Sequence, residues 1–494
     1  MSSGDSSRYA PGRNARALSV LAGVFFGISA LASGTAFAAC AGPGAPAAGS
    51  PWQCVTAIQI PGNPVTSFDI SWVDPNRAEY YLADRSNAAI DIVDTSTNKF
   101  KKQIGGFVGA KVGNATANTL NNNISGPDGV VQFSKWLYAG DGNSTLKVID
   151  LNAGTIVQSV PTGGSTRVDE MALTGPNFFM GQLLLAANNA EDPPFATLFQ
   201  VNGNNFTNNI KILARINVDP SILPPGQGLS LEQPAWDPVT KRFYVSVPNI
   251  NYPTGCTQNP AAVTGTNISS APAGAVICQG GLLVIDPSGV TAPNCTMISG
   301  IPALGSVCQY TEGGYNRTNN VGVLALATCN PNGAFVGPRT DMIGNNLLLG
   351  CTVGNNANNA SQLAINTVTT NFANVGNITG SDEVWYNPGD GHYYTGSSAN
   401  IAQFGGPTLG IIDAFANILV SQIPQGSGSH SVAADSIRNT IFVPQVVPRN
   451  ASNVAQPGAG GGDNTGVSKQ TCGGNNGCIV VYQFVPPPPP PIVD

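Results

Sequence analysis

Polar and hydrophobic positions recur along this chain in one order, at intervals of about 40 to 60 residues. In each interval a small or polar residue and an acidic or polar one precede a short hydrophobic run, and a turn leads to a second run. Ser67–Trp72 with Tyr80–Ala83, and Gly126–Val130 with Trp136–Ala139, are two examples. Short runs bounded by Gly, Pro, Asn and Asp favour β-strands, so each interval predicts a group of adjacent strands.

Seven units of this kind follow one another, and their first runs lie in segments 67–72, 126–130, 167–171, 231–238, 330–333, 381–388 and 429–435. Asp-Pro and Asn-Pro steps follow several first runs and predict the turn to the second strand. Several short strands per unit without helical periodicity predict an all-β, seven-bladed β-propeller. The alternative, an array of β-sandwiches, would need units of about 100 residues.

The last unit stops one strand short of the others. It ends after Cys478–Tyr482, whereas other units continue into fourth strands such as Thr155–Pro161 and Ile418–Pro424. Residues 54–61 precede the first unit and resemble a fourth strand. We expect this segment to complete the last blade, because pairing there removes an open sheet edge.

The amino terminus predicts export. Arg8, Arg13 and Arg16 precede the apolar run Ala17–Gly34, and Ala36–Ala38 has the small-x-small pattern of a cleavage site. A membrane anchor and lipidation of Cys40 are the alternatives. The expected organisation is a signal peptide (1–38), a linker with a disulfide (39–53), the propeller (54–484) and a proline-rich tail (485–494). Localisation is expected to be periplasmic or extracellular.

Cysteine usage agrees with an oxidising compartment. All ten cysteines lie beyond the predicted cleavage site, and none forms a Cys-x-x-Cys pair. Pairing of sequence neighbours predicts five structural disulfides, each closing a short loop rich in Gly or Asn: Cys40–Cys54, Cys256–Cys278, Cys295–Cys308, Cys329–Cys351 and Cys472–Cys478.

Charge narrows the class of partner. Only 10% of residues are charged and the net charge is -6 at pH 7. With no basic patch to neutralise phosphates, nucleic acid is not expected as a partner, and no membrane span is expected in the mature chain. The sequence predicts no particular protein partner.

Alignment of the seven units predicts a ring of polar residues around one mouth of the central channel, where the innermost strands begin. The ring consists of Asp69, Asp128, Asp169, Glu232, Asn332, Asp382 and His430, and Glu170, Gln233 and Glu383 follow directly in three units. Converging carboxylates repel one another or attract a cation. The ring and the two following glutamates are therefore the candidate ligand-binding residues.

Oxygen-rich ligands favour a divalent cation such as calcium or manganese. The candidate metal ligands are Asp128, Asp169, Glu232, Asp382 and His430. Carboxylate–histidine catalysis at a metal would use His430 as general base with Asp382. The alternative for these side chains is to hydrogen-bond the backbone of the next blade.

Other segments add little chemistry. Trp72, Trp236 and Trp385 follow the ring positions and are expected to pack between blades, and His392 is expected at the surface. The insertion 249–279 and the loop 188–194 are expected to project near a binding site.

Residues 429–435, followed by Thr440–Val443, resemble the YVTN-type repeat of exported bacterial β-propellers, and the similarity extends over about residues 54–484. The resemblance implies a propeller fold and either a binding or an enzymatic role. The chain also resembles gluconolactonase-like propellers, which have six blades and a calcium held by acidic and Asn side chains.

We therefore expect an exported propeller that binds a small ligand or cation at an acidic channel mouth. A metal-dependent hydrolase, lactonase or lyase acting at the same mouth is the alternative. A cell-surface interaction scaffold is the second alternative.

Overall fold

The computed structural model describes residues 40–114, 119–175, 182–201, 210–251, 279–290, 295–301, 305–338, 345–352, 361–448 and 463–486. The chain divides into two units, 1–36 and 37–494. The predicted signal peptide, the Cys256–Cys278 pair, nearly all of the 249–279 insertion and residues 487–494 of the tail lie outside the described residues. Within the described residues, no helix is long and apolar enough to cross a membrane.

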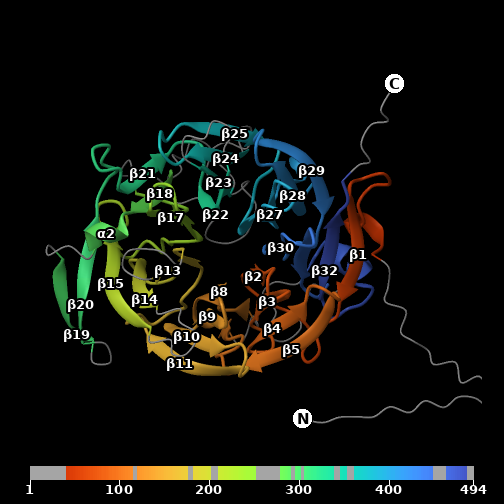
Figure 1. Cartoon of the computed structure of the whole chain (residues 1–494), viewed down its shortest axis with the longest axis horizontal. Coiled ribbons are helices and arrows are strands. Elements are labelled where there is room, and N and C mark those ends of the chain that lie inside the picture. Colours follow the sequence, from red (N-terminus) through yellow and green to blue (C-terminus); the bar gives the residue numbers. More distant parts are fainter. Residues whose placement is uncertain are drawn as a thin grey trace, which may run out of the picture. The chain divides into compact units, whose positions relative to one another are not determined.

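The second unit is a seven-bladed β-propeller, which confirms the predicted fold (Figure 1). Blades 1 and 2 are four-stranded antiparallel sheets, and a hairpin and a short 3-10 helix lie between them in the chain. Their elements are β2 (Ser71–Asp74), β3 (Glu79–Asp84), β4 (Ala89–Asp94), β5 (Lys99–Gly105), β6 (Val112–Asn114), β7 (Thr119–Leu120), η2 (Asn122–Ile124), β8 (Val130–Phe133), β9 (Trp136–Asp141), β10 (Thr145–Asp150) and β11 (Thr155–Pro161).

Blades 4, 5 and 6 are also four-stranded. Their elements are β16 (Pro234–Asp237), β17 (Arg242–Val247), β18 (Gly280–Ile285), α2 (Pro287–Val290), β21 (Gly322–Leu326), β22 (Pro331–Gly337), β23 (Asn346–Cys351), β24 (Ser361–Asn366), β25 (Phe372–Gly376), β26 (Val384–Asn387), β27 (His392–Ser397), η4 (Ala402–Phe404), β28 (Thr408–Asp413) and β29 (Ile418–Pro424). The predicted Pro residues follow directly after β16 and β26, at the turns to the second strands.

Blade 3 has six strands, which the sequence did not indicate. Its strands in sheet order are β12 (Met171–Leu173), β13 (Gln182–Asn188), β14 (Phe195–Val201), β15 (Lys211–Val218), β20 (Gly305–Glu312) and β19 (Thr296–Ile301). The β19–β20 hairpin comes from the chain between β18 and β21 of blade 4, and β20 pairs in parallel with β15. This hairpin therefore covers the outer edge of blade 3 and ties blade 4 to it.

The amino-terminal strand closes the ring as predicted. Blade 7 consists of β30 (Ala433–Asp435), β31 (Thr440–Gln445), β32 (Cys478–Phe484) and β1 (Trp52–Ile58), and β1 pairs antiparallel with β32. In Figure 1 the red β1 lies beside the blue β32. The strand begins at Trp52, two residues before the predicted start at Cys54, because Trp52 pairs with Phe484.

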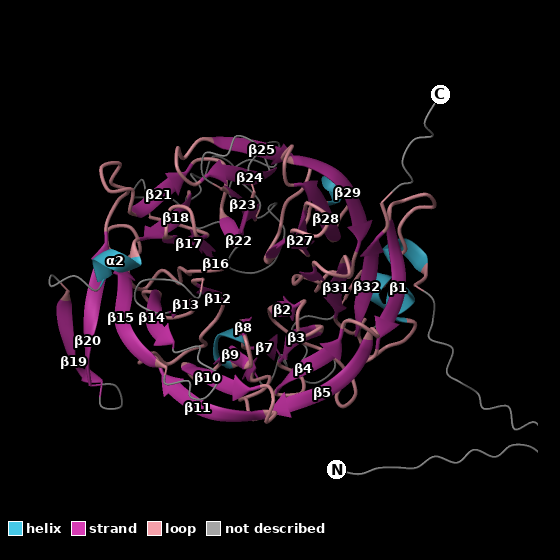
Figure 2. Ribbon diagram, in the orientation of Figure 1, coloured by secondary structure: helices cyan, strands magenta, loops and turns pink. Residues whose placement is uncertain are grey.

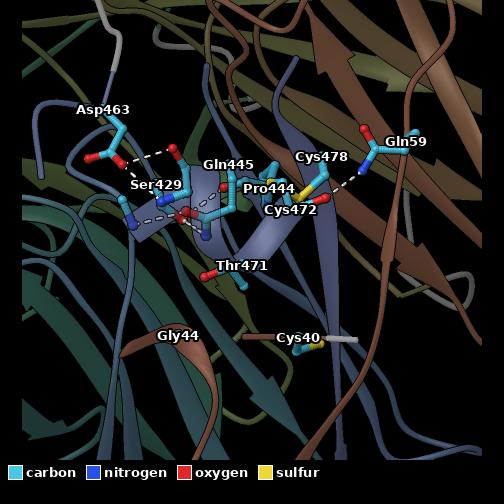
Figure 3. Close-up of a disulfide and its surroundings, with 12 residues drawn as sticks. Cys40, Gly44, Gln59, Ser429, Pro444, Gln445, Asp463, Thr471, Cys472 and Cys478 are labelled. Atoms are coloured by element: carbon cyan, nitrogen blue, oxygen red, sulfur yellow. Dashed lines mark hydrogen bonds between the residues drawn. A yellow bond between two sulfur atoms is a disulfide. The ribbon is translucent and has the colours of Figure 1, made fainter. Parts of the chain in front are cut away.

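Two of the four observed disulfides, Cys40–Cys54 and Cys472–Cys478, and two short helices secure this closure. The predicted pairs Cys40–Cys54, Cys295–Cys308, Cys329–Cys351 and Cys472–Cys478 are all formed. The last pair joins the end of α3 (Val467–Cys472) to the start of β32, and α3 packs against η1 (Gly42–Gly44). The side chain of Gln59 donates to the carbonyl of Cys472 over 3.0 Å (Figure 3). Both ends of the propeller chain are thus attached to one blade.

Burial follows the place of each strand in its blade. Every residue of β3 and β13 is buried, because second strands pack against neighbouring blades on both faces. The outer strand β11 alternates exposed and half-buried residues from Thr155 to Ser159 and buries Val160. Aromatic pairs such as Tyr80 and Phe442, with ring centres 5.0 Å apart, join adjacent blades. Each buried side chain of this size contributes about 1.5–3 kcal/mol.

His392 is not the surface residue that we expected. Its side chain is 13% exposed and packs against the rings of Trp52 and Phe484, each 5.3 Å away. Strand β1 supplies Trp52, so a residue separated by over 300 positions in sequence covers this histidine. Local sequence could not reveal that contact.

Candidate functional site

The predicted ring positions share one backbone geometry. The amide N–H of each of five ring residues donates to a carbonyl of the second strand in its own blade. These residues are Asp69, Asp128, Asp169, Glu232 and Asp382. These residues stand just before the inner strands β2, β8, β12, β16 and β26 of their blades. In Figure 2 the labelled inner strands β2, β8, β12 and β16 lie around the centre of the ring. The side chains just before them therefore gather at one mouth, called here the ring mouth.

Two second-strand glycines allow this close approach. A Cβ atom at Gly140 would collide with the carbonyl of Val168, and one at Gly396 with the carbonyl of His430. In both cases the obstructing backbone belongs to the ring segment of the next blade. A larger residue at either position would push neighbouring ring segments apart.

Arg85 neutralises part of the ring. It follows β3 directly, is 2% exposed at its side chain, and places Nη2 2.5 Å from both Asp69 Oδ2 and Asp128 Oδ1. Its Nε also donates to Asp128 over 2.9 Å. Breaking a buried pair of this kind by removing one partner costs about 3–5 kcal/mol.

Arg167 is the second cation of the ring. Its Nη2 lies 2.8 Å from Asp169 Oδ2 and its Nη1 3.8 Å from Asp69 Oδ2. Its Nε donates to Asn189 Oδ1, and the amide of Asn189 donates to Glu232. Arg85 and Arg167, with the three aspartates that they contact, form the arginine side of the ring.

The opposite part of the ring has no arginine among the described residues, and we call it the acidic side. It contains Glu170, Glu232 and Asp382, with Asn332 beside them. The amide of Asn332 donates to Asp382 Oδ1 over 3.3 Å. The side chain of Glu170 is buried, and its Oε2 has no hydrogen-bond partner among the described residues.

His430 closes the ring between the two sides. Its ring stacks on Phe68 with centroids 4.7 Å apart, and its Nδ1 lies 2.9 Å from the carbonyl of Gly428. Its Nε2 lies 3.4 Å from Asp69 Oδ1. Burial lowers the pKa of His430, but the bond to Asp69 and the charge of Asp382 outweigh burial and raise it.

Below the ring, two side chains cross the centre of the propeller. Gln233 of blade 4 accepts from the amides of Ala334 in blade 5 (2.7 Å) and Val384 in blade 6 (3.1 Å). Glu383 of blade 6 accepts from Ser431 Oγ (2.5 Å) and the amide of Val432 (3.0 Å) in blade 7. Glu383 also accepts from the amide of Ser71 in blade 1 over 3.5 Å. We call Gln233 and Glu383 the plug residues, because each joins its own blade to two others.

Burial and crowding move the pKa of these carboxyl groups. Burial, with the neighbouring charge of Asp169, raises the pKa of Glu170 well above its usual range. Burial raises the pKa of Glu232 to about 7 against the opposing charge of Arg167, and that of Glu383 to about 8. Burial also raises the pKa of Asp69, but Arg85 reverses this and lowers it below the usual value.

The predicted ring residues lie at the positions described above, and sequence reasoning did not identify the arginines among them. Arg85 and Asn189 each follow the second strand of their blade, and aligning those positions would have found both. Arg167 stands two residues before a ring position, inside the segment already aligned. Within the described residues, no group of three or more His, Cys, Asp and Glu side chains could hold a metal ion. The five candidate metal ligands are thus spread around the ring rather than gathered at one point.

Two of the three predicted core tryptophans also line an open space. Trp385 is buried, while Trp72 and Trp236 are half-buried and border a cavity in the lower part of the propeller centre. Trp72 still packs on Trp385, with ring centres 4.9 Å apart. The interpretation as packing residues is therefore incomplete for Trp72 and Trp236.

Comparison with solved structures finds low-identity matches over most of the chain. A hydrazine synthase chain of Kuenenia stuttgartiensis matches with 10% identity and a TM-score of 0.43, covering 78% of this chain and 94% of that chain. The β-propeller domain of Cps50 (Swd1) from Myceliophteria thermophila matches with 8% identity and a TM-score of 0.46, covering 87% and 98%. A chain of the mitotic checkpoint complex matches with 10% identity and a TM-score of 0.45, covering 79% and 88%.

No family model matches the sequence, and no curated protein sequence matches it. The number of blades rests on the observed sheet topology. The resemblance to YVTN-type and gluconolactonase-like propellers stays a prediction. The propeller fold and its four disulfides are consistent with an exported protein.

Proposed function

We propose that this chain is an exported propeller that binds a small ligand at the ring mouth through a cationic group of the ligand. The acidic side would hold an ammonium or guanidinium group between Glu232 and Asp382, above Glu170. One observation carries the proposal. Glu170 has a buried carboxyl oxygen without a hydrogen-bond partner among the described residues, and other carboxyl groups surround it.

An unpartnered buried carboxyl oxygen destabilises a fold unless a donor or a proton satisfies it. On the arginine side, Arg85 and Arg167 form ion pairs with the three aspartates, although Asp128 Oδ2 also has no hydrogen-bond partner among the described residues. On the acidic side, Asn189 donates to Glu232 and Asn332 donates to Asp382. No cationic side chain of the described residues forms an ion pair with these two carboxyl groups or with Glu170, so a cation from outside would complete the charge balance of the ring. Glu232 and Asp382 are half-buried and remain accessible to such a ligand.

The spacing of the acidic side chains favours an organic cation over a metal ion. A metal ion needs several oxygens converging within about 2.6 Å of one point, and no such group of acidic and histidine side chains is found among the described residues. An organic cation has several N–H donors that point in different directions, so it can serve carboxylates that stand apart. The predicted calcium or manganese is therefore the alternative outcome of the same experiment.

Because the pKa values of Glu170 and Glu232 on the acidic side are raised, binding of a cation should be coupled to the release of protons. Burial raises the pKa of Glu232 to about 7. A bound cation would stabilise the ionised form and lower this pKa, so binding would release protons. Affinity should then increase between about pH 6 and 8.

Calorimetric titration of the mature protein tests the proposal, with 1,4-diaminobutane and arginine methyl ester as organic cations and with CaCl2 and MnCl2 as metal probes. Saturable binding of an organic cation that weakens at least tenfold in Asp382→Asn supports it. Asp413→Asn is the matched control, because it removes the same charge from the same blade at the end of β28, outside the ring. The control should bind like the parent.

Other results would overturn the proposal. Binding of a metal alone, lost in Asp382→Asn, would restore the predicted metal site and justify assays with lactones and other esters, in which His430→Ala should abolish turnover. Equal binding by Asp382→Asn and Asp413→Asn, or no binding of any probe, would show that the ring mouth is not the binding site. A scaffold role would then be preferred.

A further inference from the structure

The lower half of the propeller centre contains an aromatic cavity of about 420 Å³. Its walls come from the inner strands of five blades: β2, β12, β16, β22 and β26. Four aromatic side chains line it, Trp72, Trp236, Phe335 and Tyr386, and all four are half-buried. Its volume lies within the range of about 300–1,000 Å³ that is typical of small-molecule sites.

The cavity lies at the other end of the inner strands from the ring. In blade 6, Asp382 belongs to the ring and Tyr386 to the cavity; in blade 4 the corresponding residues are Glu232 and Trp236. Four residues of extended chain span roughly 13 Å. The cavity reaches past the ends of β16 and β22, since Pro238 and Pro338 also line it.

The plug residues lie between the ring and the cavity. Gln233 lines the cavity and is 6% exposed, and Glu383 is 1% exposed. The side-chain oxygen of Gln233 already accepts two backbone hydrogen bonds. The cavity is thus a site separate from the ring mouth, and an occupant would enter from the far face.

The lining indicates the chemistry of an occupant. None of the residues that line the cavity is charged, and its polar side chains are Gln233 and Asn345. Tyr386 adds a hydroxyl group, and Trp72 and Trp236 each add an indole N–H group. The amide of Asn345 is engaged with Asp237 over 2.6 Å. A sugar would need polar partners around its ring, whereas a flat apolar molecule needs only contact with aromatic faces.

We infer that this cavity is a second binding site, which takes an uncharged, largely apolar aromatic molecule. Half-exposed rings from separate blades leave apolar surface in contact with water, and a ligand that covers it gains about 25 cal/mol for each Å² removed from water. Neighbouring packing holds the rings in place: Trp72 contacts Trp385, and Tyr386 lies 5.2 Å from Tyr393. The site is therefore largely formed before a ligand arrives.

The test uses the neutral fluorescent probe N-phenyl-1-naphthylamine, whose emission increases in apolar surroundings. We expect saturable binding near one probe per chain, with energy transfer from tryptophan. Val336→Trp places a large ring in the cavity and should weaken binding at least tenfold. Val157→Trp is the matched control on the exposed outer strand β11, and it should bind like the parent.

A second variant, Trp236→Leu, is used in case Val336→Trp does not fold. It removes one aromatic wall of the cavity and should weaken probe binding several-fold. Folding of each variant is checked by its melting temperature. Unchanged binding by a folded Val336→Trp or Trp236→Leu overturns the inference, as does the absence of saturable binding to the parent. Asp382→Asn should not alter probe binding, so failure here and failure at the ring mouth are distinguishable.

Discussion

Glu383 offers the sharpest physical prediction, because a buried carboxyl group there should titrate near neutral pH. Its side chain is 1% exposed, and burial raises its pKa from 4.5 to about 8 despite hydrogen bonds from Ser431 and Val432. In the unfolded chain the same group titrates near 4.5. Between these values the folded protein holds a proton that unfolding releases, so stability falls as pH rises.

The magnitude follows from the shift. A change from 4.5 to about 8 corresponds to about 5 kcal/mol, and about 4 kcal/mol of it is lost between pH 5 and 8. For a domain of about 450 residues the entropy of unfolding is about 1 kcal/mol per kelvin, so this loss lowers the melting temperature by about 4 °C.

The perturbation is Glu383→Gln, whose amide oxygen can accept the same hydrogen bonds but carries no titrating group. Melting curves of the parent and the variant are recorded at pH 5 and pH 8. The quantity to compare is the change in melting temperature of each protein between these two pH values. We expect the parent to lose about 4 °C more than the variant over this interval. The extra loss should disappear below pH 4.5, where the unfolded carboxyl is also protonated.

Glu191→Gln is the matched control. Burial raises the pKa of Glu191, but hydrogen bonds from Thr166 and Ser165 outweigh burial and lower it, so the carboxylate is ionised in both states from pH 5 to 8. This variant should be destabilised equally at both pH values. The reasoning is refuted if Glu383→Gln and the parent shift in parallel, or if the variant has the steeper pH dependence.

Three further predictions concern the ring and its closure. Arg85→Met should cost about 3–5 kcal/mol in urea unfolding at pH 7 and less at pH 4, where Asp69 and Asp128 can take up protons; an equal loss at both pH values would contradict the assigned ion pairs. Asp463→Ala removes acceptors for Ser427, Thr465 and Ser468 and should cost about 1–3 kcal/mol at pH 6. Because hydrogen bonds lower the pKa of Asp463 against the opposing effect of burial, the difference from the parent should narrow toward pH 3, and a constant difference would contradict this role. Replacing both cysteines of a disulfide by Ala should cost about 2 kcal/mol for Cys472–Cys478 and about 3 kcal/mol for Cys329–Cys351, since their loops span 6 and 22 residues; the reverse order in calorimetric unfolding would contradict the chain-entropy argument.

Local patterns were sufficient for the architecture of this protein. Strand periodicity, Pro at the first turn of several units and a missing fourth strand predicted seven blades and closure by the amino-terminal segment. The strands and turns depend on residues that are close in sequence, and the number of blades depends on how often the unit repeats. The same reasoning predicted four of the observed disulfides, because each closes a short loop. It could not foresee that β20 would pair with β15, because nothing local to either strand indicates that partner.

The candidate site was predictable only in part. The alignment of units found Asp69, Glu232, Asp382 and the other ring positions, since each stands at the same place in its repeat. The charge balance was not predicted, because the alignment compared the first strands and Arg85 follows a second strand. Arg85 and Arg167 also meet the aspartates only when the ring closes. The tertiary structure therefore decided that one side of the ring is neutralised and the other is not.

The sequence by itself determined which residues are polar, where strands alternate and how often the pattern repeats. These features suffice for a propeller because most strands pair with a neighbour in sequence. Only the tertiary structure decided which side chains meet at the centre. Residues from seven blades converge there across hundreds of positions, so the plug of Gln233 and Glu383 and the aromatic cavity beneath it exist only in the closed ring. Electrostatic and packing energies depend on the distances between side chains of different blades, and the sequence of a single unit does not determine these distances.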